Sequence, residues 1–216
     1  MLEGKPRLVR PEFAETFALS EKRAFDGQPL RLTDEGIWLA MPLDVLDTAL
    51  EKLQATGFWA RLGPRAKVLD AGMGDGRLVA GLCNVAHDVW AYGIESHPDL
   101  CELAQDNLRR LTERGMASSW RTCQGDYFDL STYPKLGIRL EDIDAFFNYP
   151  DGNEHKLAAF LREHGRQGTF LVVLAPDHGL ELKGLVCEEE LAIERGPGFT
   201  EFRLVLYRIH RTAGTS

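Results

Sequence analysis

Lys67-Val68-Leu69-Asp70-Ala71-Gly72-Met73-Gly74-Asp75-Gly76-Arg77 is the stretch that decides the fold. Val68 and Leu69 form a short apolar run that breaks at Gly72, and helical periodicity begins at Gly76. The stretch therefore predicts a buried strand, a glycine loop and the start of a helix. Because glycine has no side chain, a flat or negatively charged ligand can lie directly against such a loop, below the positive end of the helix. An ordinary glycine turn is the alternative that three alternate glycines leave open.

The composition indicates one soluble domain. The chain has 216 residues, of which 44% are hydrophobic, and this is enough for one well-filled core. Its 33 acidic and 25 basic residues give a net charge of -8, which would repel a phosphate backbone, so nucleic acid is not expected as a partner. The small clusters Arg109-Arg110 and Arg208/Arg211 leave it open as an alternative. No stretch approaches the roughly 18 apolar residues of a membrane helix, and the N-terminus lacks an apolar signal core, so we expect a cytoplasmic protein without membrane contact. The four cysteines show no paired metal spacing, which predicts buried, reduced thiols and no metal site.

Strands and helices alternate along most of the chain. Beside the strand and helix of the glycine stretch, the predicted helices are 11–22, 42–56, 98–114 and 153–164, and the predicted strands are 89–94, 118–124, 143–147 and 169–174. Two strand-like segments, 185–193 and 202–209, surround a Gly196-Pro197-Gly198 turn and predict an antiparallel hairpin. This order is typical of an α/β fold in which a doubly wound, mostly parallel seven-stranded sheet lies between two helical layers, a three-layer α/β/α arrangement.

Residues 1–35 differ from the rest of the chain. Their prolines and charges leave room for the helix at 11–22 alone, yet Phe13, Phe17 and Phe25 make the segment too apolar for a free tail. We expect an N-terminal extension that packs on the body, over the ligand site. Residues 36–216 then form the ligand-binding domain.

Acidic residues follow three of the predicted strands, at Asp70, Glu95 and Asp126. Ligands of open α/β sheets bind beyond the carboxyl ends of the strands, where a carboxylate such as Glu95 can accept from the ribose hydroxyls of an adenosine-type ligand. The alternative for Glu95 is a charge at the N-terminus of the next helix. Asp126 could accept from the exocyclic amine of an adenine whose ring Tyr127 or Phe128 covers, or it could be a plain turn aspartate.

These motifs together resemble those of the class I S-adenosylmethionine-dependent methyltransferases, which have a Rossmann-like fold. The stretch 68–76 looks like their first motif, Glu95 like their ribose-binding acid, Gly125-Asp126 like their adenine-contact motif, and the hairpin like their last two strands. The resemblance implies that S-adenosylmethionine is the cofactor. The residues that it implies at the cofactor are Asp70, Ala71, Gly72, Met73, Gly74, Gly76, Glu95, Ser96, Asp126, Tyr127 and Asn148. A closer likeness, to the compact lysine methyltransferases, rests on a predicted helix over 38–53 and on the turn 74–77.

Asn148-Tyr149-Pro150-Asp151 partly resembles the Asn/Asp-Pro-Pro-Tyr/Phe motif of enzymes that methylate amine or amide nitrogens. In that motif the Asn side chain and a carbonyl next to proline accept hydrogen bonds from the nitrogen and aim its lone pair at the methyl group. Asn148, Tyr149 and Asp151 are therefore the candidate catalytic residues, and a capped turn before the next helix is the alternative. A hydroxyl or ammonium acceptor would also need a base, for which Asp151, His155 and His178 are the candidates beside their alternative as solvated residues.

The sequence thus predicts an S-adenosylmethionine-dependent methyltransferase that acts on a nitrogen or oxygen atom of a small molecule or a protein. A non-catalytic module that binds S-adenosylmethionine is the first alternative. A nicotinamide-dependent oxidoreductase is the second, and it is disfavoured because its Gly-x-Gly-x-x-Gly fingerprint, counted from Gly72, requires glycine where this chain has Arg77.

Overall fold

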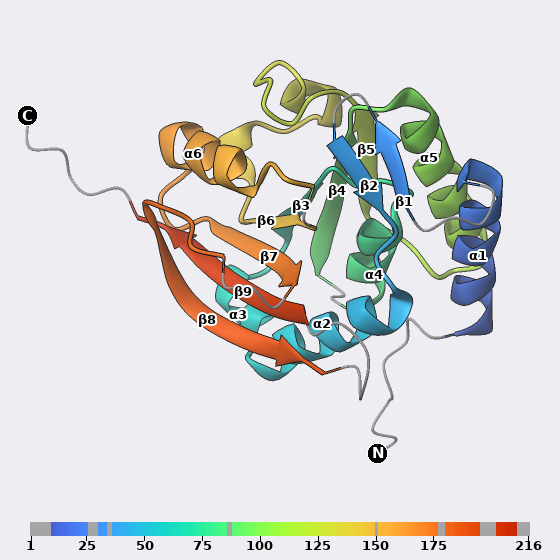
Figure 1. Ribbon diagram of the computed structural model, residues 1–216, viewed down its shortest axis with the longest axis horizontal. Helices are drawn as coiled ribbons and strands as arrows, with labels where there is room; N and C mark the ends of the chain where they lie inside the picture. The colour runs from blue at the N-terminus through green and yellow to red at the C-terminus, as the bar shows by residue number, and fades with distance from the viewer. Residues whose placement is uncertain are drawn as a thin grey trace, which may run out of the picture.

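The computed structural model describes residues 10–25, 30–33, 36–85, 88–149, 151–176, 180–194 and 202–210 (Figure 1). Within these residues the main sheet has seven strands in the order β5-β4-β3-β6-β7-β9-β8. The strands are β3 (Ala66–Ala71), β4 (Val89–Glu95), β5 (Trp120–Gln124), β6 (Ala145–Asn148), β7 (Phe170–Pro176), β8 (Leu185–Ile193) and β9 (Phe202–Ile209). The first five are parallel, whereas β9 runs antiparallel to both β7 and β8. This confirms the predicted sheet, although the Gly196-Pro197-Gly198 turn lies outside the described residues.

Helices cover both faces of the main sheet (Figure 1). One face carries α2 (Leu43–Ala55), α3 (Phe58–Leu62), α4 (Arg77–Val85) and α5 (Pro98–Glu113), and the other carries α6 (Glu154–His164) with the 3-10 turns η2 (Tyr133–Leu136) and η3 (Leu140–Asp142). Val68 belongs to the first hydrophobic core and its neighbour Leu69 to the second, because successive side chains of a strand point to opposite faces. The sheet is therefore the middle one of three layers, as predicted.

The N-terminal part of the described chain adds one helix and a small sheet. Helix α1 (Pro11–Phe25) packs against α5, with Phe13 and Phe17 fully buried in the first core (Figure 1). Strands β1 (Leu30–Thr33) and β2 (Gly36–Leu39) pair as an antiparallel hairpin that sequence analysis missed, because strands of four residues are too short to show a periodicity. The division of the chain after residue 35 falls between these two strands and stays a prediction.

The start of α2 corrects one further expectation. Trp38 lies in β2, so the helix predicted over 38–53 was wrong in its first part. The helix begins at Leu43 because Pro42 precedes it with φ -58° and ψ 135°, an extended conformation that a helix interior does not allow. The likeness to the compact lysine methyltransferases loses that part of its support.

Two expectations concern features away from the candidate site. Cys101 and Cys123 are buried free thiols as predicted, whereas Cys83 is half-buried and Cys187 is exposed, so the prediction of a buried thiol was wrong for Cys187. The reason is that Cys187 lies on β8, the outermost strand of the sheet.

None of the helices in the described part of the chain combines the length and the apolar character that a membrane span requires.

The strand order also places the candidate site. The chain starts in the middle of the main sheet with β3, adds β4 and β5 on one side, and then returns to add β6 on the other side of β3. Connections therefore leave β3 and β6 in opposite directions, and a crevice opens between their carboxyl ends. Asp70 at the end of β3 and Asn148 at the end of β6 stand at this crevice.

Candidate cofactor and acceptor site

The glycine loop follows β3 and is fixed by the neighbouring strand β4. The N–H groups of Gly72 and Met73 both donate to the carbonyl of Ile94, at 3.0 Å. Gly76 has φ 82°, in the left-handed region that favours glycine, and a Cβ there would lie 3.1 Å from the Cβ of Ala104 on α5. A side chain at position 76 would therefore strain the backbone and press on Ala104, so glycine is favoured there.

Glu95, at the end of β4, is oriented by backbone donors. It is 6% exposed, its Oε2 accepts from the N–H of Gly74 at 2.8 Å, and its Oε1 accepts from the N–H of His97 at 3.0 Å. Ser96 adds a longer hydrogen bond, from its hydroxyl to Oε1 at 3.5 Å. Because each carboxylate oxygen can accept more than one hydrogen bond, Glu95 can also accept from the hydroxyls of a ligand. Its assignment to the ribose stays a prediction.

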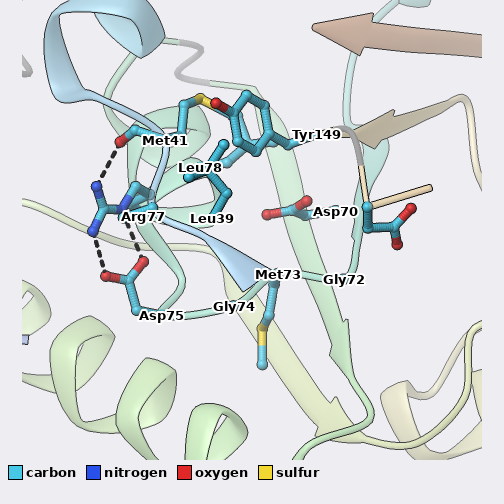
Figure 2. A pocket seen from close by; sticks show the side chains of 12 residues that line it. Leu39, Met41, Asp70, Gly72, Met73, Gly74, Asp75, Arg77, Leu78 and Tyr149 are labelled. Atoms are coloured by element: carbon cyan, nitrogen blue, oxygen red, sulfur yellow. Dashed lines mark hydrogen bonds and ion pairs between the residues drawn. The ribbon is translucent and has the colours of Figure 1, made fainter. Parts of the chain in front are cut away.

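A pocket opens beside the loop (Figure 2). It is lined by Leu39, Ala40, Met41, Asp70, Gly72, Met73, Gly74, Asp75, Arg77, Leu78, Tyr149 and Asp151. The Asp70 carboxylate and the Tyr149 ring face this space, whereas the Met73 side chain points away from it, so Met73 lines the pocket with its backbone. The Met73 sulfur instead packs on Gly93, where a Cβ would lie 2.3 Å from it.

Asp70 makes the pocket electrostatically suited to a cation. The residue is 4% exposed, and burial raises the pKa of its carboxyl well above the usual range. The charges of Glu95, Asp75 and Asp151 raise this pKa further, in that order. A positive group of a bound ligand would offset both effects.

We expect the substitution Asp70→Asn to stabilise the free protein near neutral pH. Since the pKa of Asp70 is raised on folding, its ionisation costs stability at every pH above the folded-state pKa, and this cost disappears as the pH falls through that value toward the unfolded-state pKa. The neutral amide removes the cost, which should raise the free energy of unfolding by about 1–3 kcal/mol near neutral pH and by almost nothing in acid. Urea unfolding at several pH values measures it.

Asp126→Asn is the matched control for this prediction. Its carboxylate is exposed, and an asparagine oxygen can accept the same hydrogen bond from the Phe128 N–H. We expect its stability to match the wild type at each pH. A constant difference between Asp70→Asn and the wild type across the pH range would contradict the assignment of the cost to the Asp70 charge.

Asn148 offers a buried hydrogen-bond acceptor. It is 2% exposed, and its Nδ2 donates to the carbonyl of Ala71 at 3.3 Å. Its Oδ1 is also buried and accepts no hydrogen bond from the described residues. Asn148 is not among the residues that line the pocket, although its neighbour Tyr149 is. An unpaired buried oxygen costs about 1–3 kcal/mol, and a donor on a molecule that reached it would remove this cost.

The side chains of Asp151 and Tyr127 contact each other next to Gly72. The Tyr127 hydroxyl donates to Oδ2 of Asp151 at 2.8 Å, and a Cβ on Gly72 would lie 3.7 Å from that oxygen. Burial, followed by the Asp151 charge, raises the pKa of Tyr127 far above its usual value, so Tyr127 remains a hydrogen-bond donor. The structure thus brings together Asp70, Tyr127, Asp151 and the loop.

The remaining candidates are exposed or lie outside the described chain. Asp126 is exposed, and its Oδ1 accepts from the Phe128 N–H at 2.8 Å, as in the turn that was its alternative interpretation. A role for Asp126 at an adenine stays a prediction. His155 is exposed on α6, and His178 lies outside the described residues.

Sequence analysis missed the part that Asp75 and Arg77 play at this site. Both are buried, at 1% and 4% exposure, and the guanidinium binds the carboxylate with two hydrogen bonds, Nε to Oδ1 at 2.9 Å and Nη2 to Oδ2 at 2.7 Å. Two opposite charges two residues apart in a glycine loop are visible in the sequence. The sequence gives no sign of the residues far away in the chain, such as Ser20 and Met41, that bind Asp75 and Arg77.

Comparison with known proteins supplies the class of fold. No protein-family model matches the sequence, and no curated protein matches it. An RNA methyltransferase from Salinibacter ruber, solved with S-adenosylhomocysteine, matches with a TM-score of 0.56 and 22% identity over 80% of this chain and 95% of that chain. The rRNA methyltransferase aviRa from Streptomyces viridochromogenes matches with a TM-score of 0.57 and 16% identity over 82% and 88% of the two chains. The mitomycin 7-O-methyltransferase MmcR matches with a TM-score of 0.56 and 18% identity over 79% and 56%.

The chain therefore has the fold of the class I S-adenosylmethionine-dependent methyltransferases, as the sequence motifs implied. The three neighbours are named for methyl transfer to RNA, to rRNA and to mitomycin. Because one fold serves acceptors of such different chemistry, the acceptor of this protein has to be argued from its own site.

Proposed function

We propose that this protein is a methyltransferase that uses S-adenosylmethionine and methylates a nitrogen or oxygen atom of a small molecule or a protein. The observation that carries the proposal is the hydrogen bond from the Gly74 N–H to Oε2 of Glu95, at 2.8 Å. This contact joins the glycine loop to the acid expected at the ribose, at the carboxyl edge of a sheet with the methyltransferase fold.

The residues of the pocket fit the cofactor. S-adenosylmethionine carries an ammonium group and a sulfonium methyl group, and the buried carboxyl of Asp70 favours a cation in the pocket. Gly72 and Gly74 line the same space without side chains, so a ligand can approach their backbone. Glu95 would accept from the ribose hydroxyls. When bound, the cofactor supplies a methyl group that a nucleophile can displace.

Asn148 is the residue best suited to orient the nucleophile. Its buried Oδ1 can accept an N–H or O–H of the acceptor molecule and so direct a lone pair toward the methyl group. Leu39, Met41 and Tyr149 give the pocket apolar surface, which helps to exclude water from the transfer. An amine that has lost its proton would need no further base.

Calorimetry with S-adenosylhomocysteine tests the cofactor, and transfer of a radiolabelled methyl group to a panel of amines, hydroxyl compounds, proteins and RNA tests the reaction. We expect S-adenosylhomocysteine to bind, a reduced nicotinamide cofactor to give no heat, and an amine or hydroxyl acceptor to be methylated. Binding without any transfer would favour the non-catalytic module. Absence of binding would contradict the proposal, and transfer to RNA alone would contradict the acceptor class.

A further inference from the structure

One side of the pocket comes from the N-terminal part of the chain. Residues 39–41, here called the wall segment, begin at the last residue of β2 and line the pocket opposite the glycine loop. Figure 2 shows the guanidinium of Arg77 between the carbonyl of Met41 and the carboxylate of Asp75. Arg77 thus joins the two sides of the pocket.

Arg77 uses four of its five N–H donors within the protein. Beside the two hydrogen bonds to Asp75, its Nη1 donates to the carbonyl of Met41 at 2.5 Å and its Nη2 to Oε1 of Glu21 at 3.1 Å. The guanidinium carbon also lies 5.3 Å from the ring centre of Phe17. One buried side chain therefore binds α1, the wall segment and the glycine loop at once.

A second set of hydrogen bonds fixes Asp75 from the opposite direction. The hydroxyl of Ser20 on α1 donates to Oδ2 of Asp75 at 3.0 Å. Asn107 on α5 donates from Nδ2 to the Ser20 hydroxyl at 3.1 Å and to the Asp75 carbonyl at 3.0 Å. Ser20 and Asn107 are each 1% exposed. Buried polar networks with their members paired are rigid, so the carboxylate that receives Arg77 is itself held in place.

The geometry points to Arg77 as a positioning residue of the cofactor site: it holds the wall segment against the glycine loop and so sets the width of the pocket. The inference rests on the proposed function, and Arg77 acts through Met41 and Asp75. Lysine cannot replace it, because an ammonium lacks the planar fork that reaches Asp75 and the Met41 carbonyl together. By thermodynamic reciprocity, a ligand that binds between the two sides must in turn stabilise the wall segment.

Calorimetry with S-adenosylhomocysteine on the full chain tests this inference. We expect Arg77→Lys to bind about 10-fold more weakly than the wild type, since it keeps a charge near Asp75 but loses the contact to Met41. Glu21→Gln should bind within about threefold of the wild type, because the Glu21 side chain is 38% exposed and its ion pair is screened by solvent. The matched control is Arg109→Lys, because Arg109 is 61% exposed and pairs only with Asp106 at 2.6 Å among the described residues. Its affinity should equal that of the wild type.

Circular dichroism at the calorimetry temperature confirms that each variant is folded. A purely structural role for Arg77 would lower the unfolding temperature and leave the affinity of the folded protein unchanged. Equal affinity of folded Arg77→Lys and wild type therefore overturns the inference, while the proposed function stands. If the wild type itself gives no heat, the proposed function fails and the inference fails with it.

Hydrogen exchange on the wild type provides a test that needs no variant to fold. Addition of S-adenosylhomocysteine should slow amide exchange in the wall segment as well as in residues 72–77. Slower exchange in residues 72–77 without any change in the wall segment would overturn the inference. The same result would leave cofactor binding itself intact.

Discussion

Glu95→Ala is expected to weaken the binding of S-adenosylhomocysteine by at least about 100-fold. Two hydrogen bonds from ribose hydroxyls to a carboxylate are each worth about 1.5–3 kcal/mol, and each 1.4 kcal/mol corresponds to about 10-fold in affinity. The substitution also leaves the N–H of Gly74 without its acceptor, which loosens the loop. Isothermal titration calorimetry on the folded variant measures the effect.

Two further variants separate ligand binding from helix stability at this position. Glu95→Gln keeps the shape of the side chain and one oxygen acceptor, so we expect an intermediate loss of about 10-fold. Asp99→Ala removes an exposed acidic residue from the first turn of α5 and serves as the control for a helix-terminus charge. If Glu95 acted only on the helix, Asp99→Ala and Glu95→Ala would lower affinity equally, and the ribose assignment would be wrong.

Asn148→Ala is expected to lower the turnover number by about 100-fold and to change the affinity for S-adenosylhomocysteine by less than about threefold. The expected loss follows from the buried Oδ1, because a nucleophile that is no longer oriented toward the methyl group reacts much more slowly. Steady-state transfer of a radiolabelled methyl group to the acceptor found in the panel measures the turnover number.

Asn153→Ala tests the alternative in which this segment only begins α6. Asn153 stands at the N-cap of α6, and its side chain makes no capping hydrogen bond there, so its loss should change neither turnover nor affinity. Unchanged turnover in Asn148→Ala would refute a catalytic role for that residue. A large loss of affinity in Asn148→Ala would instead assign it to the cofactor site through its contact with Ala71.

The sequence predicts the main sheet well because its strands have strong local signals. The bounds 185–193 and 202–209 expected for the hairpin agree with β8 and β9 at every end. Segment 202–209 is rich in apolar and β-branched or aromatic residues, and 185–193 has apolar residues at both ends around the run Glu188-Glu189-Glu190, with turn residues between the two segments. The β1–β2 hairpin was missed because each of its strands holds four residues and gains its stability from the pairing.

For the candidate site, too, local features could be predicted from the sequence and contacts between distant residues could not. Glycines that break an apolar strand identify the loop from sequence, since the backbone conformation that needs them is local. Arg77 is a local partner of Asp75, but the other side-chain partner of Asp75, Ser20, lies 55 residues away along the chain. Polar residues in an amphipathic helix give no sign of which buried carboxylate they contact, so the hydrogen bond from Ser20 of α1 to Asp75 had to come from the structure.

The order of the chain has a consequence for its synthesis. Helix α1 is synthesised before its partners, because its Ser20 binds Asp75 and Asn107, which follow 55 and 87 residues later in the chain. A helix of 15 residues is marginal in water by itself, so α1 cannot take its final place until α5 has emerged. Helix α1 is thus translated before the residues that hold it and docks after them, and the pocket beside it is complete only once Tyr149 and Asp151 have also been made.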